Sequence, residues 1–248
     1  MMRLLSRVAL AAMLLPPLAA QDDNWGQIDQ LNDDKMFDAE YELLSAMATL
    51  HAGDVAYLWR MSRHHFTLSD NSDDPQVISR NIYSGLDFAR LALAADSTSA
   101  QAHGYYGILI GRAGEIEGTK QKIVNSYEVA AHTLTAIELG SEDDAWQHVM
   151  GRWHFALSDL SWLERTFASI IYATPPEASF EEAEDYFMEA ARMAPEDIRH
   201  YLWLGKTRIE LKNSQGARSS LKTALALPAK SDSDNLLQAE AQTLLGGL

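Results

Sequence analysis

The chain has 248 residues, and 47% of them are hydrophobic, so it can bury the core of one or two domains. It contains no cysteine, which excludes disulfides, thiolate catalysis and cysteine metal sites. The formal net charge of −15 favours solubility and argues against general nucleic-acid binding, which needs a basic surface.

Residues 1–20 have the composition of a signal peptide. Arg3 and Arg7 precede a short apolar run, and prolines and small residues follow as far as Ala20. An uncleaved membrane anchor is the alternative, but the apolar run is too short to span a bilayer comfortably. We therefore expect cleavage after Ala20 and a periplasmic or secreted protein without a transmembrane span. The polar residues 21–32 are predicted to be a flexible segment.

From residue 33 onward the apolar residues recur with the period of an α-helix. The pattern favours helices over 33–50, 55–68 and 75–94, and a fourth that starts near Ser99. The same period continues to Leu245, and no alternating β-branched pattern interrupts it. The chain is therefore predicted to be all-α.

The helices form repeats with the spacing of tetratricopeptide motifs. Each copy has a small residue in its first helix and an alanine in its second, which lets the two helices pack closely. The interval is 19 residues from Gly205 to Ala224 and 39 from Gly151 to Ala190, so some hairpins carry insertions. The four pairs are Ser62 with Ala92, Gly107 with Ala136, Gly151 with Ala190, and Gly205 with Ala224.

This repeat predicts a tetratricopeptide-like, right-handed α-solenoid over residues 33–248. It would contain about four helical hairpins with insertions and end in a capping helix over 231–248. Stacked hairpins bury a continuous core that one hairpin cannot form alone. The first helix of each hairpin would line a concave groove.

The predicted groove carries basic residues next to large apolar ones. Arg63, Arg152 and Lys206 occupy the same position in three of the four repeats. Such a row suits an anionic group with an apolar body, held by charge-assisted hydrogen bonds. The alternative is that these cations pair with acidic residues of adjacent helices. The predicted ligand-binding residues are Trp59, Arg63, Phe66, Ile108, Arg112, His148, Arg152, Phe155 and Lys206.

The third hairpin contains an apolar insertion over residues 159–176. We predict an amphipathic helical extension that stops at two prolines. It is either a lid or membrane-touching wedge over the groove, or extra core packed along its own hairpin. The insert residues assigned to the lid are Trp162, Phe167, Ile171 and Tyr172.

No catalytic motif is present. The chain has no Gly-rich phosphate loop, no His-Glu-x-x-His pair and no nucleophile elbow, so we predict neither an enzyme nor a cofactor. His64 and His65 are adjacent and point about 100° apart on a helix, so they cannot clasp one metal ion together. We expect ordinary surface or core roles for the histidines and no metal site.

The run GRWHFALSDLSWLERTFASIIYATPPEASFEEAEDYFMEA, residues 151–190, resembles the signature of the regulator of microtubule dynamics family. Residues 114–123 and 225–230 resemble further segments of that family, and the resemblance covers about residues 54–248. It implies a solenoid that binds partners and, for animal members at organelle contact sites, phospholipid. Within this run, we expect Glu164 and Arg165 to form an ion-pair network that fixes the insert.

Together these features predict a non-catalytic, exported module that recognises a protein or peptide in its groove. The alternative is a carrier of a phospholipid or another amphipathic anion in the same groove. Membrane contact is compatible with both functions, whereas nucleic acid is not an expected partner.

Overall fold

The computed structural model describes residues 24–160, 162–171 and 176–248. These residues form 12 α-helices and no strand, which confirms the all-α fold. The helices are α1 (Asn24–Asp33), α2 (Phe37–His51), α3 (Val55–Asp70), α4 (Pro75–Ala95), α5 (Ala100–Glu117), α6 (Thr119–Glu138), α7 (Asp144–Ser158), α8 (Trp162–Ile171), α9 (Phe180–Met193), α10 (Ile198–Glu210), α11 (Ser214–Ala226) and α12 (Asp232–Gly246).

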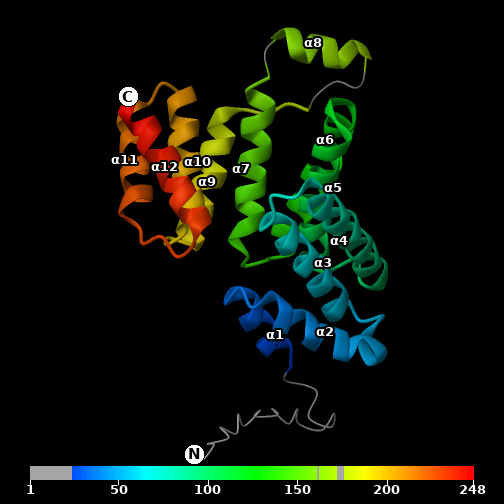
Figure 1. The fold of residues 1–248 in the computed structure, drawn as a ribbon. Helices are drawn as coiled ribbons and strands as arrows, with labels where there is room; N and C mark the ends of the chain where they lie inside the picture. The colour runs from blue at the N-terminus through cyan, green and yellow to red at the C-terminus, as the bar shows by residue number, and fades with distance from the viewer. Residues whose placement is uncertain (1–23, 161, 172–175) are drawn as a thin grey trace, which may run out of the picture.

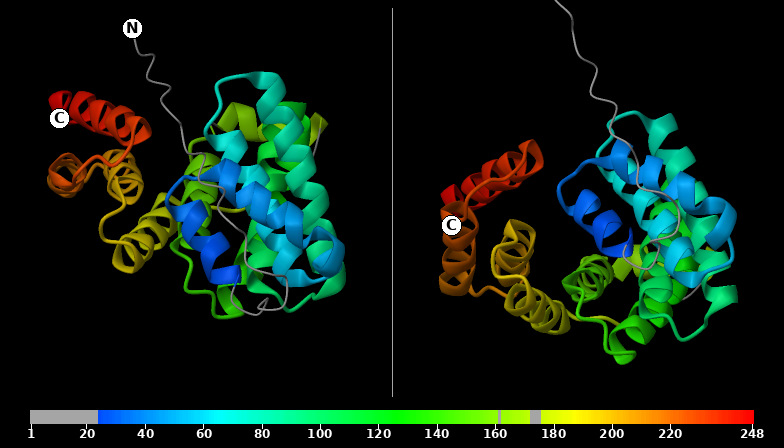
Figure 2. Two further views of the ribbon diagram at one scale, coloured as in Figure 1. Left: turned by 60° about the horizontal axis from the view of Figure 1, so that its bottom comes forward. Right: turned by 90° about the horizontal axis from the view of Figure 1, so that it is seen from below.

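The helices pack as a stack of hairpins. The tightest pairs are α3 with α4, α5 with α6, α7 with α9, and α10 with α11, so the four predicted hairpins are confirmed. Each hairpin contacts the next along the chain, and the stack follows a curved path (Figures 1 and 2). Helix α12 packs against α10 and α11 at the end of the stack, as predicted for the capping helix.

The small residues of the repeat lie where each first helix meets its second helix. A Cβ on Gly151 would lie 2.7 Å from the ring of Phe187, and one on Gly205 would lie 2.6 Å from the Leu221 side chain. The hydroxyl of Ser62 donates to a backbone carbonyl of α4 at 3.0 Å. Close approach of the two helices therefore requires these small side chains, which is the physical basis of the predicted pattern.

Short polar side chains begin many of the helices. At each such position the side-chain oxygen accepts a hydrogen bond from a backbone N–H of the first turn, which satisfies a donor that the helix itself leaves free. Residues with this role are Asp74, Ser99, Asp143, Ser179, Asp197, Asn213 and Ser231.

The N-terminal region differs from the predicted flexible segment. Residues 24–33 form helix α1, and its Ile28 is completely buried in a cluster with Leu44 and Met47 of α2. One buried apolar residue is too weak a periodic signal to predict a helix from sequence. The predicted signal peptide lies outside the described residues.

The insertion forms the separate helix α8 at one end of the α7–α9 hairpin (Figure 1). Arg165 attaches α8 to the hairpin by donating to the carbonyls of Leu157 at 2.6 Å and Pro176 at 3.2 Å. Ile170 is 78% exposed, whereas Ala168 is buried. Tyr172 and the side chains of Trp162, Glu164, Phe167 and Ile171 lie outside the described part, so both interpretations of the insert stay predictions.

None of the helices in the described ranges combines the length and the apolar character that a membrane crossing requires.

Candidate functional site

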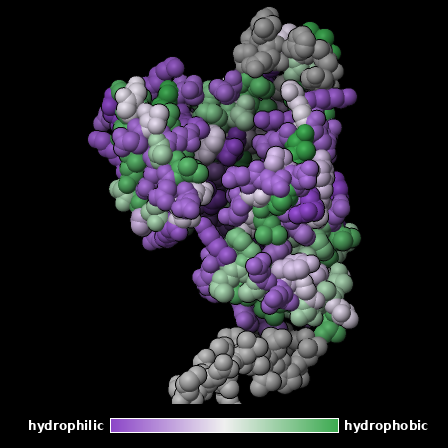
Figure 3. All heavy atoms as spheres, in the orientation of Figure 1, coloured by the Kyte–Doolittle hydropathy of each residue, from purple (hydrophilic) through white to green (hydrophobic). Residues whose placement is uncertain are grey.

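The predicted groove residues come from the first helices α3, α5, α7 and α10, which follow one another along the inside of the stack. Figure 3 shows a hollow between the C-terminal helices and α3–α5, and its visible wall is largely hydrophilic. Several of the predicted residues contact one of two aromatic rings, Tyr105 and Trp203. Tyr105 stands two positions before Gly107, and Trp203 stands two positions before Gly205, the small residues of their repeats. This spacing is the sequence signal that would have identified both aromatic residues.

The first group joins α3 to α5 and is mostly packed. The Trp59 ring stacks on Tyr105 with centroids 6.1 Å apart, and Phe66 lies 6.4 Å from the same ring. Ile108 packs against the same core. Burial raises the pKa of Tyr105 far above its ordinary value, so its hydroxyl stays neutral. These predicted groove residues therefore contribute mainly to the joint between two hairpins.

Arg63 is paired with acidic residues of the N-terminal helices. Its guanidinium lies 2.8 Å from Asp29 of α1 and 3.1 Å from Glu40 of α2. Arg60 adds two further bonds to Asp29, at 2.8 and 2.7 Å. Burial alone would raise the pKa of Asp29, but the hydrogen bonds and charges of the two arginines lower it below its usual value. At this end of the groove the cations already hold a carboxylate.

Lys206 is paired in the same way at the other end. Its ammonium lies 2.9 Å from Glu240 of α12 and 4.0 Å from the centroid of the Trp203 ring. Between the two ends, Arg112 of α5 lies 3.2 Å from Asp70 and 3.5 Å from Glu115. Three of the predicted groove cations are therefore paired with nearby acidic residues, namely Arg63, Arg112 and Lys206.

Arg152 differs from the other predicted groove cations. Its guanidinium lies 4.0 Å above the Trp203 ring, and within the described residues no carboxylate comes within ion-pair distance of it. The surrounding protein lowers its pKa by desolvation, and the charge of Arg112 acts in the same direction, whereas Glu115 opposes the change. The residue is nevertheless exposed to solvent. Arg152 thus presents a cation that an external anion can reach.

Phe155 and His148 lie on the same helix as Arg152 but are occupied by packing. The Phe155 ring meets those of Trp203 and Phe180, each at 5.3 Å. His148 is buried, and its Nδ1 lies 3.0 Å from Nδ1 of His200. Burial, and then the charges of nearby Arg199 and His200, lower the pKa of His148 well below its ordinary value, so the imidazole is neutral.

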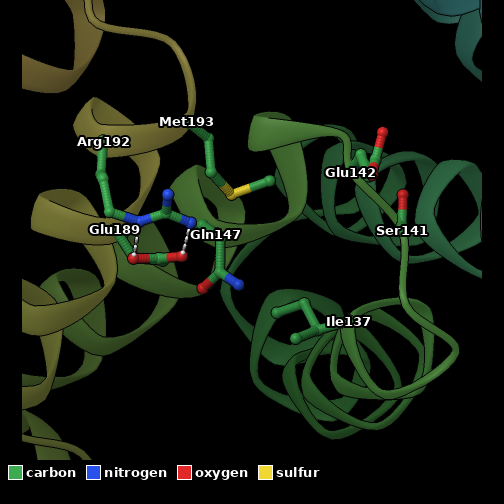
Figure 4. A pocket seen from close by; sticks show the side chains of 7 residues that line it. All are labelled: Ile137, Ser141, Glu142, Gln147, Glu189, Arg192 and Met193. Carbon is green, nitrogen blue, oxygen red and sulfur yellow. Dashed lines mark hydrogen bonds and ion pairs between the residues drawn. The ribbon is translucent and has the colours of Figure 1, made fainter.

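A pocket of about 470 Å³ lies away from these residues, between α6, α7 and α9 (Figure 4). Arg192 and Glu189 form an ion pair of 2.6 Å at its edge, and the hydrogen bond from Arg192 lowers the pKa of Glu189. Sequence reasoning did not find this pocket, because it forms only where two consecutive hairpins meet. Its lining residues are Ile137, Ser141, Glu142, Gln147, Glu189, Arg192 and Met193.

The comparison with known families gives a match that covers nearly the whole described chain. Residues 25–248 match the family model "Regulator of microtubule dynamics protein 1-3". The chain belongs to this family. The resemblance seen in residues 151–190 is thereby confirmed.

Individual relatives of the regulator of microtubule dynamics family agree with this match. Regulator of microtubule dynamics protein 1 of Mus musculus is 33% identical over 241 residues, which cover 96% of this chain and 78% of the relative. The Bos taurus protein 1 is 35% identical over 225 residues, 89% of this chain and 70% of the relative. Protein 3 of Mus musculus is 27% identical over 221 residues, 88% of this chain but 47% of the relative.

Among solved structures, a thermophilic TPR protein from Thermus thermophilus superimposes with a TM-score of 0.63. The match covers 88% of this chain and 97% of that protein at 12% sequence identity. Similarity at this level concerns the fold alone. It confirms that this family member is a tetratricopeptide-like α-solenoid.

Proposed function

We propose that this protein is a non-catalytic binding module that holds an acidic protein or peptide segment in its concave groove. Arg152 would bind a carboxylate of the partner. The observation that carries the proposal is the contrast between Arg152 and the two other cations of the same row. Tetratricopeptide solenoids generally use their concave surface for binding, which agrees with this assignment.

The chain itself supplies an example of the binding mode. At one end of the groove, Asp29 of helix α1 bonds Arg60 and Arg63; at the other end, Glu240 of α12 bonds Lys206. In both cases a carboxylate on a helix meets a groove cation. Arg152 lies between these two ends and has the same chemistry without an internal partner among the described carboxylates. A carboxylate of a partner chain would give Arg152 the kind of ion pair that Arg63 and Lys206 already have.

The aromatic ring beneath Arg152 supports a role in binding. The guanidinium stacks on Trp203, which restricts the arginine before a ligand arrives. A preorganised guanidinium loses less entropy when it forms two parallel hydrogen bonds to a carboxylate. The nearby Arg112 adds positive potential, although Asp70 and Glu115 partly offset it.

The alternative ligand, a phospholipid or another amphipathic anion, would use the same arginine. Its apolar body would need free apolar surface in the groove. Trp59, Phe66 and Phe155 are instead packed against neighbouring rings, which favours a protein segment over an acyl chain. Binding of phospholipid vesicles is therefore a separate outcome of the test below.

The test is a peptide array probed with the purified chain, together with a sedimentation assay of the same protein with anionic phospholipid vesicles. Each peptide is presented with its acidic residues intact and with those residues changed to amides. We expect the wild-type protein to bind the acidic peptides and not their amide forms. Arg152→Gln protein should bind neither form. Arg90→Gln is the matched control, because Arg90 is an exposed arginine on the second helix α4, where it pairs with Asp87. Equal binding by both variants, or binding of anionic vesicles alone, would contradict the proposal.

We also propose that the protein acts after export. The support is the basic, apolar and small-residue order of residues 1–20. Expression in a bacterial host with two membranes tests this proposal. The expected product is periplasmic and begins at Gln21 by mass spectrometry. A cytoplasmic product that retains Met1 or Met2 would contradict it.

A further inference from the structure

The beginnings of α7 and α10 bring together three possible metal ligands. Asp144 is the first residue of α7, Asp197 caps α10, and His200 lies in the first turn of α10. One ligand atom from each residue lies within 4.8 Å of the other two. His200 Nε2 is 2.8 Å from the Asp144 carboxylate and 3.8 Å from that of Asp197.

The donor set suits a borderline divalent metal ion. One imidazole nitrogen and two carboxylate oxygens are common ligands of Zn²⁺, and three protein ligands leave a fourth position for water. Sequence spacing did not reveal the set, because 56 residues separate Asp144 from His200. Only the stacking of the third hairpin on the fourth places them together.

The other nitrogen of His200 has a partner that would fix the ring. His200 Nδ1 lies 3.0 Å from Nδ1 of His148, and both imidazoles are buried. With a metal ion on Nε2, the proton of His200 would stay on Nδ1, and this N–H would donate a hydrogen bond to Nδ1 of His148. Histidines that bind metal ions almost always donate their second N–H to a hydrogen-bond acceptor, which orients the ring, and here the acceptor is an imidazole nitrogen.

We propose that Asp144, Asp197 and His200 bind one divalent metal ion of the zinc class, and that His148 is the residue that positions His200. The ion would join the first helices of the third and fourth hairpins.

Arg199 competes with the metal ion in this proposal. Its guanidinium lies 2.5 Å from the Asp197 carboxylate that the ion would use. The Arg199 side chain is 48% exposed, so it can turn into solvent when the ion binds. Removing this arginine therefore frees a ligand. Arg199→Gln should tighten metal binding even though the residue is no ligand.

A second histidine pair in the chain provides a matched control. His103 Nδ1 lies 2.9 Å from His132 Nδ1, which repeats the geometry of the His148–His200 pair. The remaining nitrogen of His103 instead meets the carbonyl of Ser97 at 3.0 Å. The His148–His200 pair thus has two aspartates beside it, whereas His103 has a backbone carbonyl in their place. His132→Gln should therefore leave metal binding unchanged.

The experiment titrates the chelator-treated full chain with Zn²⁺ by calorimetry and with Co²⁺ by visible absorption. The wild type should bind one ion per chain. Asp144→Asn and His200→Gln should lose this binding, and His148→Gln should weaken it about 10- to 100-fold. Circular dichroism of each metal-free variant checks folding. Because Asp144 is partly exposed, its amide variant should retain the wild-type melting temperature without metal.

Three results would overturn the proposal. The first is the absence of stoichiometric binding by the wild type. The second is binding that persists unchanged in Asp144→Asn and His200→Gln, since the ion would then occupy another site. The third is loss of binding in His132→Gln to the same degree as in the ligand variants. A result in which Arg199→Gln binds more weakly than the wild type would contradict the competition with Asp197.

Discussion

At the scale of single residues, histidines that the fold partly or wholly removes from water set the expected pH dependence of stability. Burial lowers the pKa of His65, His132 and His154 below the ordinary value of 6.5. The unfolded chain therefore takes up protons at a higher pH than the folded chain does. Stability should be fully present above about pH 6.5 and should decline as the pH falls from there towards the lowered pKa values.

His65 is the histidine on which this pH dependence can be tested, and its Nδ1 lies 2.9 Å from Oδ1 of Asn81. The free energy of unfolding, measured by urea denaturation, should fall between about pH 7.5 and about pH 5.5, and each histidine contributes at most about 1.4 kcal/mol per pH unit. In His65→Gln the decline should be shallower than in the wild type. Identical slopes would show that His65 does not take part.

The glycines of α5 act through contact with neighbouring side chains. A Cβ on Gly104 would lie 2.4 Å from the indole ring of Trp146, which is fully buried. Gly104→Ala should therefore destabilise the protein by about 1–3 kcal/mol through overpacking. The same substitution at Gly26 meets nothing within 4 Å and should be neutral or stabilise by up to about 1 kcal/mol. Thermal unfolding of both variants checks this prediction, and an equal effect would contradict it.

At the scale of elements, ion pairs to arginines of α3 hold helix α1 in place more than the helical tendency of its own residues does. Asp29 receives bonds from Arg60 and Arg63, and Ile28 supplies the buried contact. In Asp29→Asn, the amide protons of residues 24–33 should exchange roughly tenfold faster, equivalent to about 1.4 kcal/mol for a partly exposed pair. Asp34→Asn, at the exposed end of α1, is the control. Unchanged exchange in α1 would show that the ion pairs do not hold it.

The contrast between α1 and the hairpins shows what the sequence can predict at this scale. Ser62, Gly107, Gly151 and Gly205 predict the hairpins because steric contact between two helices directly restricts those positions. Helix α1 has no such restriction within its own residues. Its position depends on arginines of α3, of which Arg60 is 31 residues away from Asp29. Interactions of that range leave no periodic trace.

At the scale of the whole molecule, the sequence predicts the row of groove cations, and pairing with acidic residues as one alternative, but not which of the cations are paired. Repeat position identifies Arg63, Arg152 and Lys206 as equivalent residues. The structure then distinguishes them, because terminal helices outside the repeats supply Asp29 and Glu240 to two of the three. Which cation stays accessible is thus decided by how α1 and α12 close the two ends of the stack. The Trp203 ring beneath Arg152 likewise depends on the fourth hairpin packing against the third.

The measurement that most directly tests the proposed binding role is the affinity for an acidic peptide selected on the wild-type protein. Calorimetry would compare the wild type, Arg152→Gln and the control Arg90→Gln. We expect Arg152→Gln to bind at least about tenfold more weakly, because a charge-assisted pair is lost, and Arg90→Gln to bind like the wild type. Equal affinities for all three proteins would contradict it.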